Sequence, residues 1–149
     1  MKKEYMLEAL KEAKKAFELN EVPIGCVIVK NDEIIARAHN MKENNQQTVD
    51  HAEMIAINLA SKKLGTWHLD DSDIYVTLEP CAMCASCIMQ SRIKNVYFGA
   101  YDKSGGALGS IFNLYELKGF NYYPSYYGGI MEEECRAIIK EFFKKIREK

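Results

Sequence analysis

The residues best suited to chemistry in this chain are one histidine, two cysteines and one glutamate, carried by two short segments. These segments are His51-Ala52-Glu53 and Pro80-Cys81-Ala82-Met83-Cys84. Zinc takes nitrogen and sulfur ligands in a tetrahedral arrangement, and a catalytic zinc keeps one position open for water. We therefore predict that His51, Cys81 and Cys84 bind a zinc ion and that Glu53 lies near its open position.

The spacing of these residues indicates how such a site would work. Cys81 and Cys84 are three residues apart and share one helix face, and the positive end of a helix favours the thiolate that binds zinc. Glu53 would take a proton from zinc-bound water, whose pKa falls to about 7, and return protons to the substrate. The pattern His-x-Glu…Pro-Cys-x-x-Cys is the recognised signature of zinc-dependent nucleobase deaminases. The predicted reaction is hydrolytic removal of an amine from a nucleobase.

Three other interpretations of the cysteines explain less of the pattern. An iron–sulfur cluster of the bacterial type would need a further cysteine where Ser91 stands. A structural zinc closed by Cys87 would have to span about 9 Å of helix rise from Cys81. A thioredoxin-like redox pair leaves His51 and Glu53 without a role. The catalytic zinc site is the interpretation that uses all four residues.

Composition sets the broad class of protein. The chain has 149 residues, of which 48% are hydrophobic, which predicts a single folded domain over residues 1–149. A net charge of −1 and a pI of about 6.3 argue against a uniformly basic nucleic-acid-binding surface, although local patches remain open. The sequence predicts no membrane span and no signal peptide, so we expect a cytoplasmic protein. Five cysteines without an export signal argue against a disulfide framework.

The order of predicted elements places the motif at one edge of a sheet. Strands that alternate with helices after an initial hairpin predict a mixed sheet covered by helices. Sites in such sheets lie at the carboxyl ends of the strands, and Pro80-Cys81 directly follows a predicted strand. The expected elements are a helix ending before 20–23, strands at 24–29 and 33–38, a loop at 40–49, a helix at 51–64, a strand at 74–78, a helix from 80 to about 91, a strand at 95–100, a short helix at 110–117, an edge strand at 122–127 and a final helix through 135–146.

Beyond the metal motif, the chain resembles the tRNA-specific adenosine deaminases, which convert the wobble adenosine of a tRNA anticodon to inosine. The resemblance covers nearly the whole length. It implies an α/β fold of three layers, α/β/α, with a central mixed five-stranded sheet of the cytidine deaminase type. It also implies one Zn²⁺ per subunit, a homodimer, and the tRNA anticodon stem-loop as substrate. Segments that carry it include Glu21-Val22-Pro23-Ile24-Gly25, Ala38-His39-Asn40, Thr77-Leu78-Glu79-Pro80-Cys81, Ser91-Arg92-Ile93 and Phe142-Phe143.

The same resemblance implies roles for five substrate-binding residues. Asn40 would hydrogen-bond the extruded base, and Val22 and Pro23 would wall its pocket. Asp102 would contact the sugar–phosphate region, and Phe143 would pack near the neighbouring nucleotide. An extruded base does need a polar group to read its edge and apolar walls to stack on. A loop cap, a turn proline and a core aromatic are the structural alternatives for these positions.

One departure from the family pattern bears on substrate choice. The family usually has Thr-Ala before His-Ala-Glu, where this chain has Val49-Asp50. Asp50 could cap the following helix or alter specificity. Two other functions therefore stay open: deamination of a free nucleobase or nucleoside of the guanine or cytosine type, and a non-catalytic zinc protein that binds RNA. Basic residues of the last helix that suit RNA are Lys140, Lys144, Lys145 and Arg147.

Overall fold

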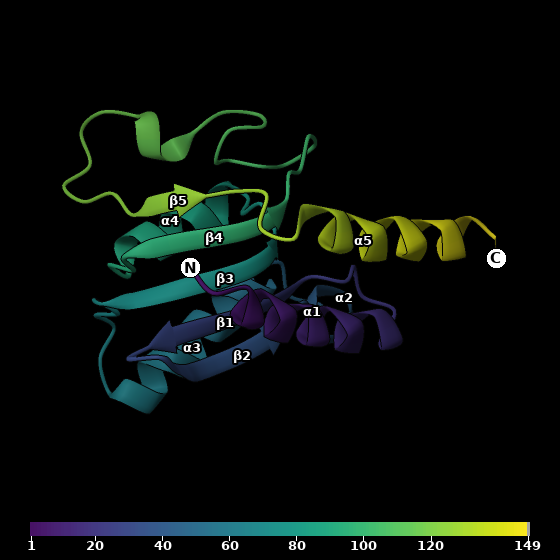
Figure 1. The fold of residues 1–149 in the computed structure, drawn as a ribbon, viewed down its shortest axis with the longest axis horizontal. Coiled ribbons are helices and arrows are strands. Elements are labelled where there is room, and N and C mark those ends of the chain that lie inside the picture. Colours follow the sequence, from purple (N-terminus) through teal and green to yellow (C-terminus); the bar gives the residue numbers. More distant parts are fainter. Residues whose placement is uncertain (149) are drawn as a thin grey trace.

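A five-stranded mixed sheet with helices on both faces forms the framework of the molecule (Figure 1). The computed structural model describes residues 1–148. Within them, no helix combines the length and the apolar character needed to cross a bilayer. The elements are α1 (Lys3–Glu18), β1 (Gly25–Lys30), β2 (Glu33–His39), α2 (Lys42–Asn45), α3 (Ala52–Leu64), β3 (Ser72–Leu78), α4 (Ala82–Gln90), β4 (Asn95–Ala100), the 3₁₀ helix η1 (Leu114–Glu116), β5 (Ser125–Tyr127) and α5 (Glu132–Arg147).

The strand order is β2-β1-β3-β4-β5. β1 is antiparallel to both β2 and β3, whereas β3, β4 and β5 run parallel to one another. The β1–β2 turn has positive φ at Asn31 and Asp32, 52° and 58°, which matches the twist of a tight hairpin. The predicted hairpin, mixed sheet and edge strand are confirmed.

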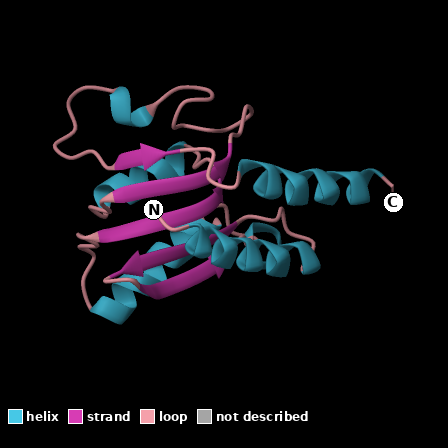
Figure 2. Cartoon of the chain, in the orientation of Figure 1, coloured by secondary structure: helices cyan, strands magenta, loops and turns pink. Residues whose placement is uncertain are grey.

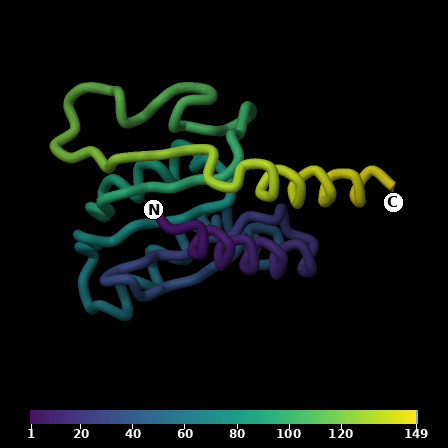
Figure 3. Tube along the Cα trace, in the orientation of Figure 1, coloured from purple at the N-terminus to yellow at the C-terminus, as the bar shows by residue number. Residues whose placement is uncertain are grey.

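Each face of the sheet buries its own apolar layer. Successive residues of a strand point to opposite faces, so Tyr75 packs under α1 while Val76 packs under α3 and α4. α1 and α5 lie side by side on the face of the sheet toward which Tyr75 points, as Figure 3 shows. Their contact includes an edge-to-face pair of Phe17 and Phe142, with ring centroids 5.7 Å apart. The three-layer α/β/α architecture is thereby confirmed.

The predictions fail in the connections rather than in the sheet. The stretch 40–49, predicted as a loop, contains the short helix α2. The helix predicted at 110–117 is reduced to a single 3₁₀ turn, and most of the connection from β4 to β5 is irregular (Figure 2). The reason for α2 is a long-range contact: the buried carboxylate of Glu21 accepts hydrogen bonds from the amides of Glu43 and Asn44 at its start. Local sequence patterns do not reveal such partners.

Glu12 is an acidic residue buried on the inner face of α1, with 2% of its surface exposed. Its carboxylate accepts hydrogen bonds from Lys15 at 2.8 Å and His39 at 3.0 Å, and Arg37 lies 3.8 Å away. Burial on its own would raise the pKa of Glu12, but these partners outweigh it and lower the pKa. Glu12 is therefore a buried carboxylate that is stabilised by its hydrogen bonds to Lys15 and His39.

This pairing predicts a loss of stability in acid. Because the folded pKa lies below the unfolded value of about 4.3, the stabilisation is present above that value and is lost as pH falls through the folded pKa. We expect the free energy of unfolding, measured by urea denaturation between pH 3 and 7, to decrease below about pH 4.5. Glu12→Gln should reduce this decrease, whereas Glu18→Gln, at an exposed position of the same helix, should leave it intact. Equal acid sensitivity in both variants would contradict the assignment.

Candidate metal centre and its cavity

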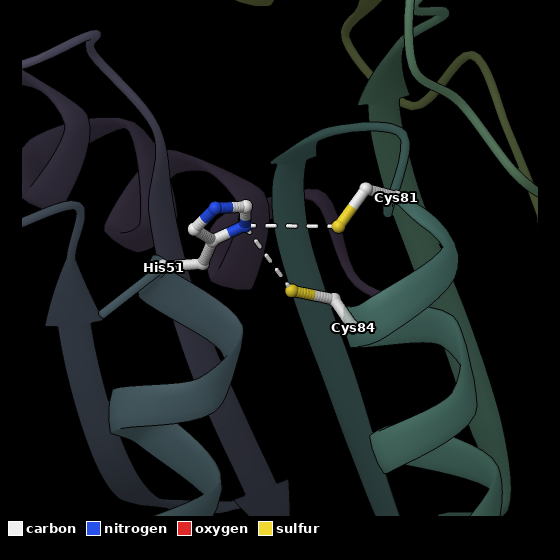
Figure 4. Close-up of side chains that lie close together, drawn as sticks. All are labelled: His51, Cys81 and Cys84. Carbon is white, nitrogen blue, oxygen red and sulfur yellow. Dashed lines mark hydrogen bonds between the residues drawn. The ribbon is translucent and has the colours of Figure 1, made fainter. Parts of the chain in front are cut away.

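The three predicted metal ligands meet where α3 and α4 begin. His51 is the N-cap of α3 and Cys81 the N-cap of α4, both in extended conformation. An N-cap side chain commonly accepts a hydrogen bond from the first turn, but neither residue makes one here. Cys84 lies one turn into α4 and faces the same point (Figure 4). The starts of the two helices therefore bring together three side chains that can each supply a ligand atom to a metal, and neither N-cap side chain is used for capping.

The distances among these donors fit a tetrahedral zinc ion. The Nδ1 atom of His51 lies 3.5 Å from Sγ of Cys84 and 3.7 Å from Sγ of Cys81. Zinc bonds of about 2.3 Å to sulfur and 2.0–2.1 Å to nitrogen, set at the tetrahedral angle, place such atoms about 3.6 Å apart. Within residues 1–148, the cluster of possible ligands comprises these three residues, and Cys87 lies outside it. Zinc fits this donor set without rearrangement.

The two thiols differ in their affinity for a proton. A hydrogen bond from Cys84 lowers the pKa of Cys81 to about 4. The same bond raises the pKa of Cys84, and burial raises it further. His51 also interacts with Cys81, and this contact raises the pKa of the imidazole. Since zinc binds thiolates, metal binding would release the proton that Cys84 holds.

Glu53 stands beside this centre in the first turn of α3. Only 4% of its surface is exposed, and burial raises the pKa of its carboxyl to about 7. It lies close enough to Cys84 to raise the pKa of that thiol. A bound divalent cation would act in the opposite direction and favour the carboxylate. The residue thus occupies the position expected of a group that exchanges protons near the metal.

A cavity of about 420 Å³ opens beside His51. Four of the five predicted substrate-binding residues line it, namely Val22, Asn40, Asp102 and Phe143. Pro23, the fifth, is buried and is not among the lining residues. The volume lies within the usual range for small-molecule sites, about 300–1,000 Å³.

Asn40 is held in place by its neighbours. Its Nδ2 donates to the carbonyl of Val22 at 3.3 Å, and its Oδ1 accepts from the amide of Lys42 at 3.0 Å. A carboxamide has two donors and two acceptor lone pairs. One of each therefore remains for a ligand in the cavity.

Phe143 does not belong to the core. Its neighbour Phe142 is 3% exposed and packs against Phe17, whereas Phe143 is 43% exposed at the cavity. The sequence left open whether Phe143 lies in the core or at the substrate site. The structure answers this, because Phe142 fills the core position on α5 and Phe143 stays exposed. Phe143 is an aromatic face available to a partner.

Three cations of the cavity wall were not identified from the sequence. They are Lys42, Lys103 and Arg136. Arg136 could have been identified from the sequence, because positions 136, 139 and 143 lie on one face of a helix. Ile139 and Phe143 also line the cavity. Lys42 and Lys103 lie in connections, where no periodicity marks a face. Positive charge beside the cavity suits a substrate that carries phosphate.

Asp50 neither caps α3 nor lines the cavity. The N-cap of α3 is His51, and Asp50 is not among the cavity-lining residues. Its Oδ2 accepts from the side chain of Asn45 at 2.8 Å, and its carbonyl accepts from the amide of Met41 at 3.0 Å. Asp50 closes the loop around α2.

Comparison with known proteins gives consistent matches. Residues 1–100 match the family model of the cytidine and deoxycytidylate deaminase zinc-binding region. The tRNA-specific adenosine deaminase of Bacillus subtilis (strain 168) is 51% identical over 145 residues, covering 97% of this chain and 90% of that protein. The corresponding protein of Aquifex aeolicus (strain VF5) is 46% identical, covering 99% and 97% of the two chains.

Solved structures agree with the fold. One from a study of A-to-I editing by tRNA:A34 deaminases at the wobble position superposes with a TM-score of 0.89 at 39% identity, covering 92% of this chain and 99% of the other. A guanine deaminase from Nitrosomonas europaea superposes with a TM-score of 0.79 at 18% identity, covering 95% and 84%. At that identity the second likeness concerns the fold alone.

Substitution of the cysteines of α4 tests the ligand set. We expect Cys84→Ser to weaken zinc binding by more than about 100-fold, since changes to residues that merely support metal ligands already cost 10–100-fold. Cys87→Ser, three residues further along the same helix, should keep its zinc. Metal analysis after dialysis against a weak chelator would measure both. Zinc loss in the Cys87 variant, or zinc retained in the Cys84 variant, would show that the donor set is different.

Proposed function

The chain belongs to the tRNA-specific adenosine deaminases of the cytidine and deoxycytidylate deaminase family, and on this basis we propose that it converts adenosine to inosine at the wobble position of tRNA. One observation supports this most directly: the zinc-binding donor set, with the buried Glu53 beside it, contributes His51 to a cavity lined by an amide, apolar groups and cations. A nucleobase, its sugar and its phosphate would each find a suitable partner there.

In the proposed reaction, water adds its oxygen to C6 of adenine, the C6–N bond breaks and ammonia leaves. His51, Cys81 and Cys84 would hold the zinc. When bound, zinc lowers the pKa of water so that a nucleophile is available at neutral pH. Glu53 would accept one proton from the water and deliver it to the ring nitrogen, then accept the second proton from the hydroxyl now on C6 and deliver it to the leaving amine. Its buried position keeps these transfers away from bulk solvent.

The cavity accounts for how an adenine in RNA would be held. Enzymes that act on a base within a nucleic acid take it out of the stack into a pocket. Asn40 would read the polar edge of the base through the donor and acceptor that its own hydrogen bonds leave free. Val22 would pack on the ring, with Pro23 behind that wall, Asp102 would approach the sugar, and Phe143 would stack near the next nucleotide. Lys42, Lys103 and Arg136 would meet the phosphates.

We further propose a homodimer with one zinc per subunit. Met54, Trp67, Met83 and Cys87 line a hollow at α3 and α4, and Trp67 is 56% exposed. Exposed apolar patches of this kind mark interaction sites, and a second copy of the chain is the partner that the family suggests. We also propose that residues 1–149 act as one deaminase domain in the cytoplasm, where its five free thiols would stay reduced.

The decisive experiment is an inosine assay with a Glu53 variant. The purified protein should form inosine at the wobble position of a tRNA. Glu53→Ala should keep its zinc but lose activity by at least about 10²–10⁴-fold, the usual contribution of general acid–base catalysis. Activity would be followed by inosine-specific cleavage or mass spectrometry, and zinc by metal analysis.

Other outcomes of the assay would point to the other two functions. Absence of inosine together with ammonia release from guanine or cytosine would indicate a free-base deaminase. Full activity in the Glu53 variant would refute the proton-transfer role, and zinc-dependent RNA binding without turnover would indicate a non-catalytic protein.

Salt dependence tests the contact with RNA. Lys144 is exposed near the end of α5, whereas Lys145 lies over the ring of Phe17 at 5.1 Å, so Lys144 is the cleaner position. If Lys144 neutralises a phosphate, Lys144→Glu should weaken tRNA binding and reduce the slope of log K against log[salt] by about 1. Lys94 directly precedes β4, at the end of the strand away from the cavity. Lys94→Glu should change neither the affinity for tRNA nor the salt slope. Equal slopes in all three proteins would remove α5 from the interface.

A further inference from the structure

Glu79 is a buried acidic residue between the end of β3 and the metal ligand Cys81. Only 2% of its surface is exposed. A buried carboxylate is costly unless its lone pairs are satisfied. In this chain the partners come from a single segment, the connection that follows β4.

Four hydrogen bonds join the Glu79 carboxylate to that connection. Its Oε1 accepts from the amide of Asp102 at 3.0 Å and from the hydroxyl of Ser110. Its Oε2 accepts from the amides of Leu108 and Ser110, at 3.0 and 3.1 Å. The segment 101–110 therefore folds around one side chain, with backbone amides aimed at it from both ends.

The close approach of backbone to carboxylate requires glycine at position 106. A Cβ atom on Gly106 would lie 2.2 Å from the carboxyl carbon of Glu79 and 2.4 Å from each oxygen. Charge-assisted hydrogen bonds of this kind are about twice as strong as neutral ones. The loop is built on the carboxylate rather than merely packed beside it.

This loop forms one wall of the substrate cavity. Tyr101, Asp102, Lys103 and Ser104 line it. The backbone ties the two residues that precede Cys81 to the end of β4 and to this loop: the amide of Glu79 donates to the carbonyl of Ala100 at 2.8 Å, and the carbonyl of Pro80 accepts from the amide of Ala107 at 2.9 Å. The wall and the metal ligand are thus fastened to one short stretch of chain.

We propose that Glu79 is a positioning residue for substrate, which fixes Asp102 and its loop at a set distance from the metal ligands. The inference rests on the proposed function, since it assigns the loop to substrate binding. A purely structural role would lower stability and leave substrate affinity alone. A positioning role would raise KM for RNA more than it lowers kcat, because Asp102 contacts the substrate rather than the reacting atoms.

Glu79→Gln is the direct test, with Glu12→Gln as its matched control. Both glutamates are 2% exposed and hydrogen-bonded through both carboxylate oxygens, but Glu12 lies on α1 with partners Lys15 and His39. The amide of glutamine keeps the size of the side chain and replaces an acceptor oxygen by a donor. KM and kcat for an anticodon stem-loop, zinc content, melting temperature and amide hydrogen exchange would be measured for each protein.

We expect Glu79→Gln to raise KM about tenfold, which corresponds to the loss of one charge-assisted hydrogen bond. Zinc content should stay the same, kcat should change by less than about threefold, and the amides of Asp102, Leu108 and Ser110 should exchange faster. Glu12→Gln should lower the melting temperature without changing KM. Ser110→Ala removes one of the four hydrogen bonds to Glu79 and should raise KM by about two- to threefold. This variant replaces Glu79→Gln as the test if Glu79→Gln does not fold.

The results separate this inference from the proposed function. Unchanged KM and unchanged amide exchange in Glu79→Gln, or a KM increase equal to that of Glu12→Gln, would overturn the positioning role. Loss of zinc in Glu79→Gln would overturn it too, by assigning the effect to the metal centre. If the unaltered protein forms no inosine, the proposed function fails, and the exchange of these three amides alone decides whether Glu79 holds the loop.

Discussion

The structure depends on one constraint: two helices must begin at the same point on the carboxyl edge of the sheet. His51 and Cys81 are the N-cap residues of those helices, and neither side chain makes a capping hydrogen bond, so both are free to bind a metal. Cys84 reaches the same point from the first turn of α4. The positive ends of both helices favour the thiolate charge that zinc requires. The 3.5 and 3.7 Å separations follow from this convergence.

The proposed substrate cavity is assembled mainly from connections. One wall is the segment after β2, which bears Asn40 and is held by the buried carboxylate of Glu21. Another wall is the segment after β4, which bears Asp102 and surrounds Glu79. α5 closes a third side with Phe143. Buried carboxylates let irregular backbone keep a defined shape, because each one satisfies several amides at once.

The accuracy of sequence-based prediction followed the range of the interactions involved. The strand at 95–100 was predicted to the residue, because a short run of apolar and aromatic residues is a local signal. The short helix α2 was missed because the amides at its start find their partner, Glu21, far away in the chain, and the helix predicted at 110–117 is only the turn η1. Phe143 could be placed in the core or at the surface on helical periodicity alone. Only the contact between Phe142 and Phe17, from another helix, separated the two.

The sequence by itself determined the chemistry of the site: one imidazole, two thiols and one carboxylate at spacings typical of a catalytic zinc, on a sheet flanked by helices. Residue type and local periodicity are enough for that. Only the tertiary structure decided which side chains face the cavity, since this depends on how separate loops are fastened to the sheet. It brought Lys42, Lys103 and Arg136 to the cavity, turned Asp50 toward Asn45 and centred a loop on Glu79. The loop around Glu79 rests on hydrogen bonds between residues distant in sequence, which leave no local pattern.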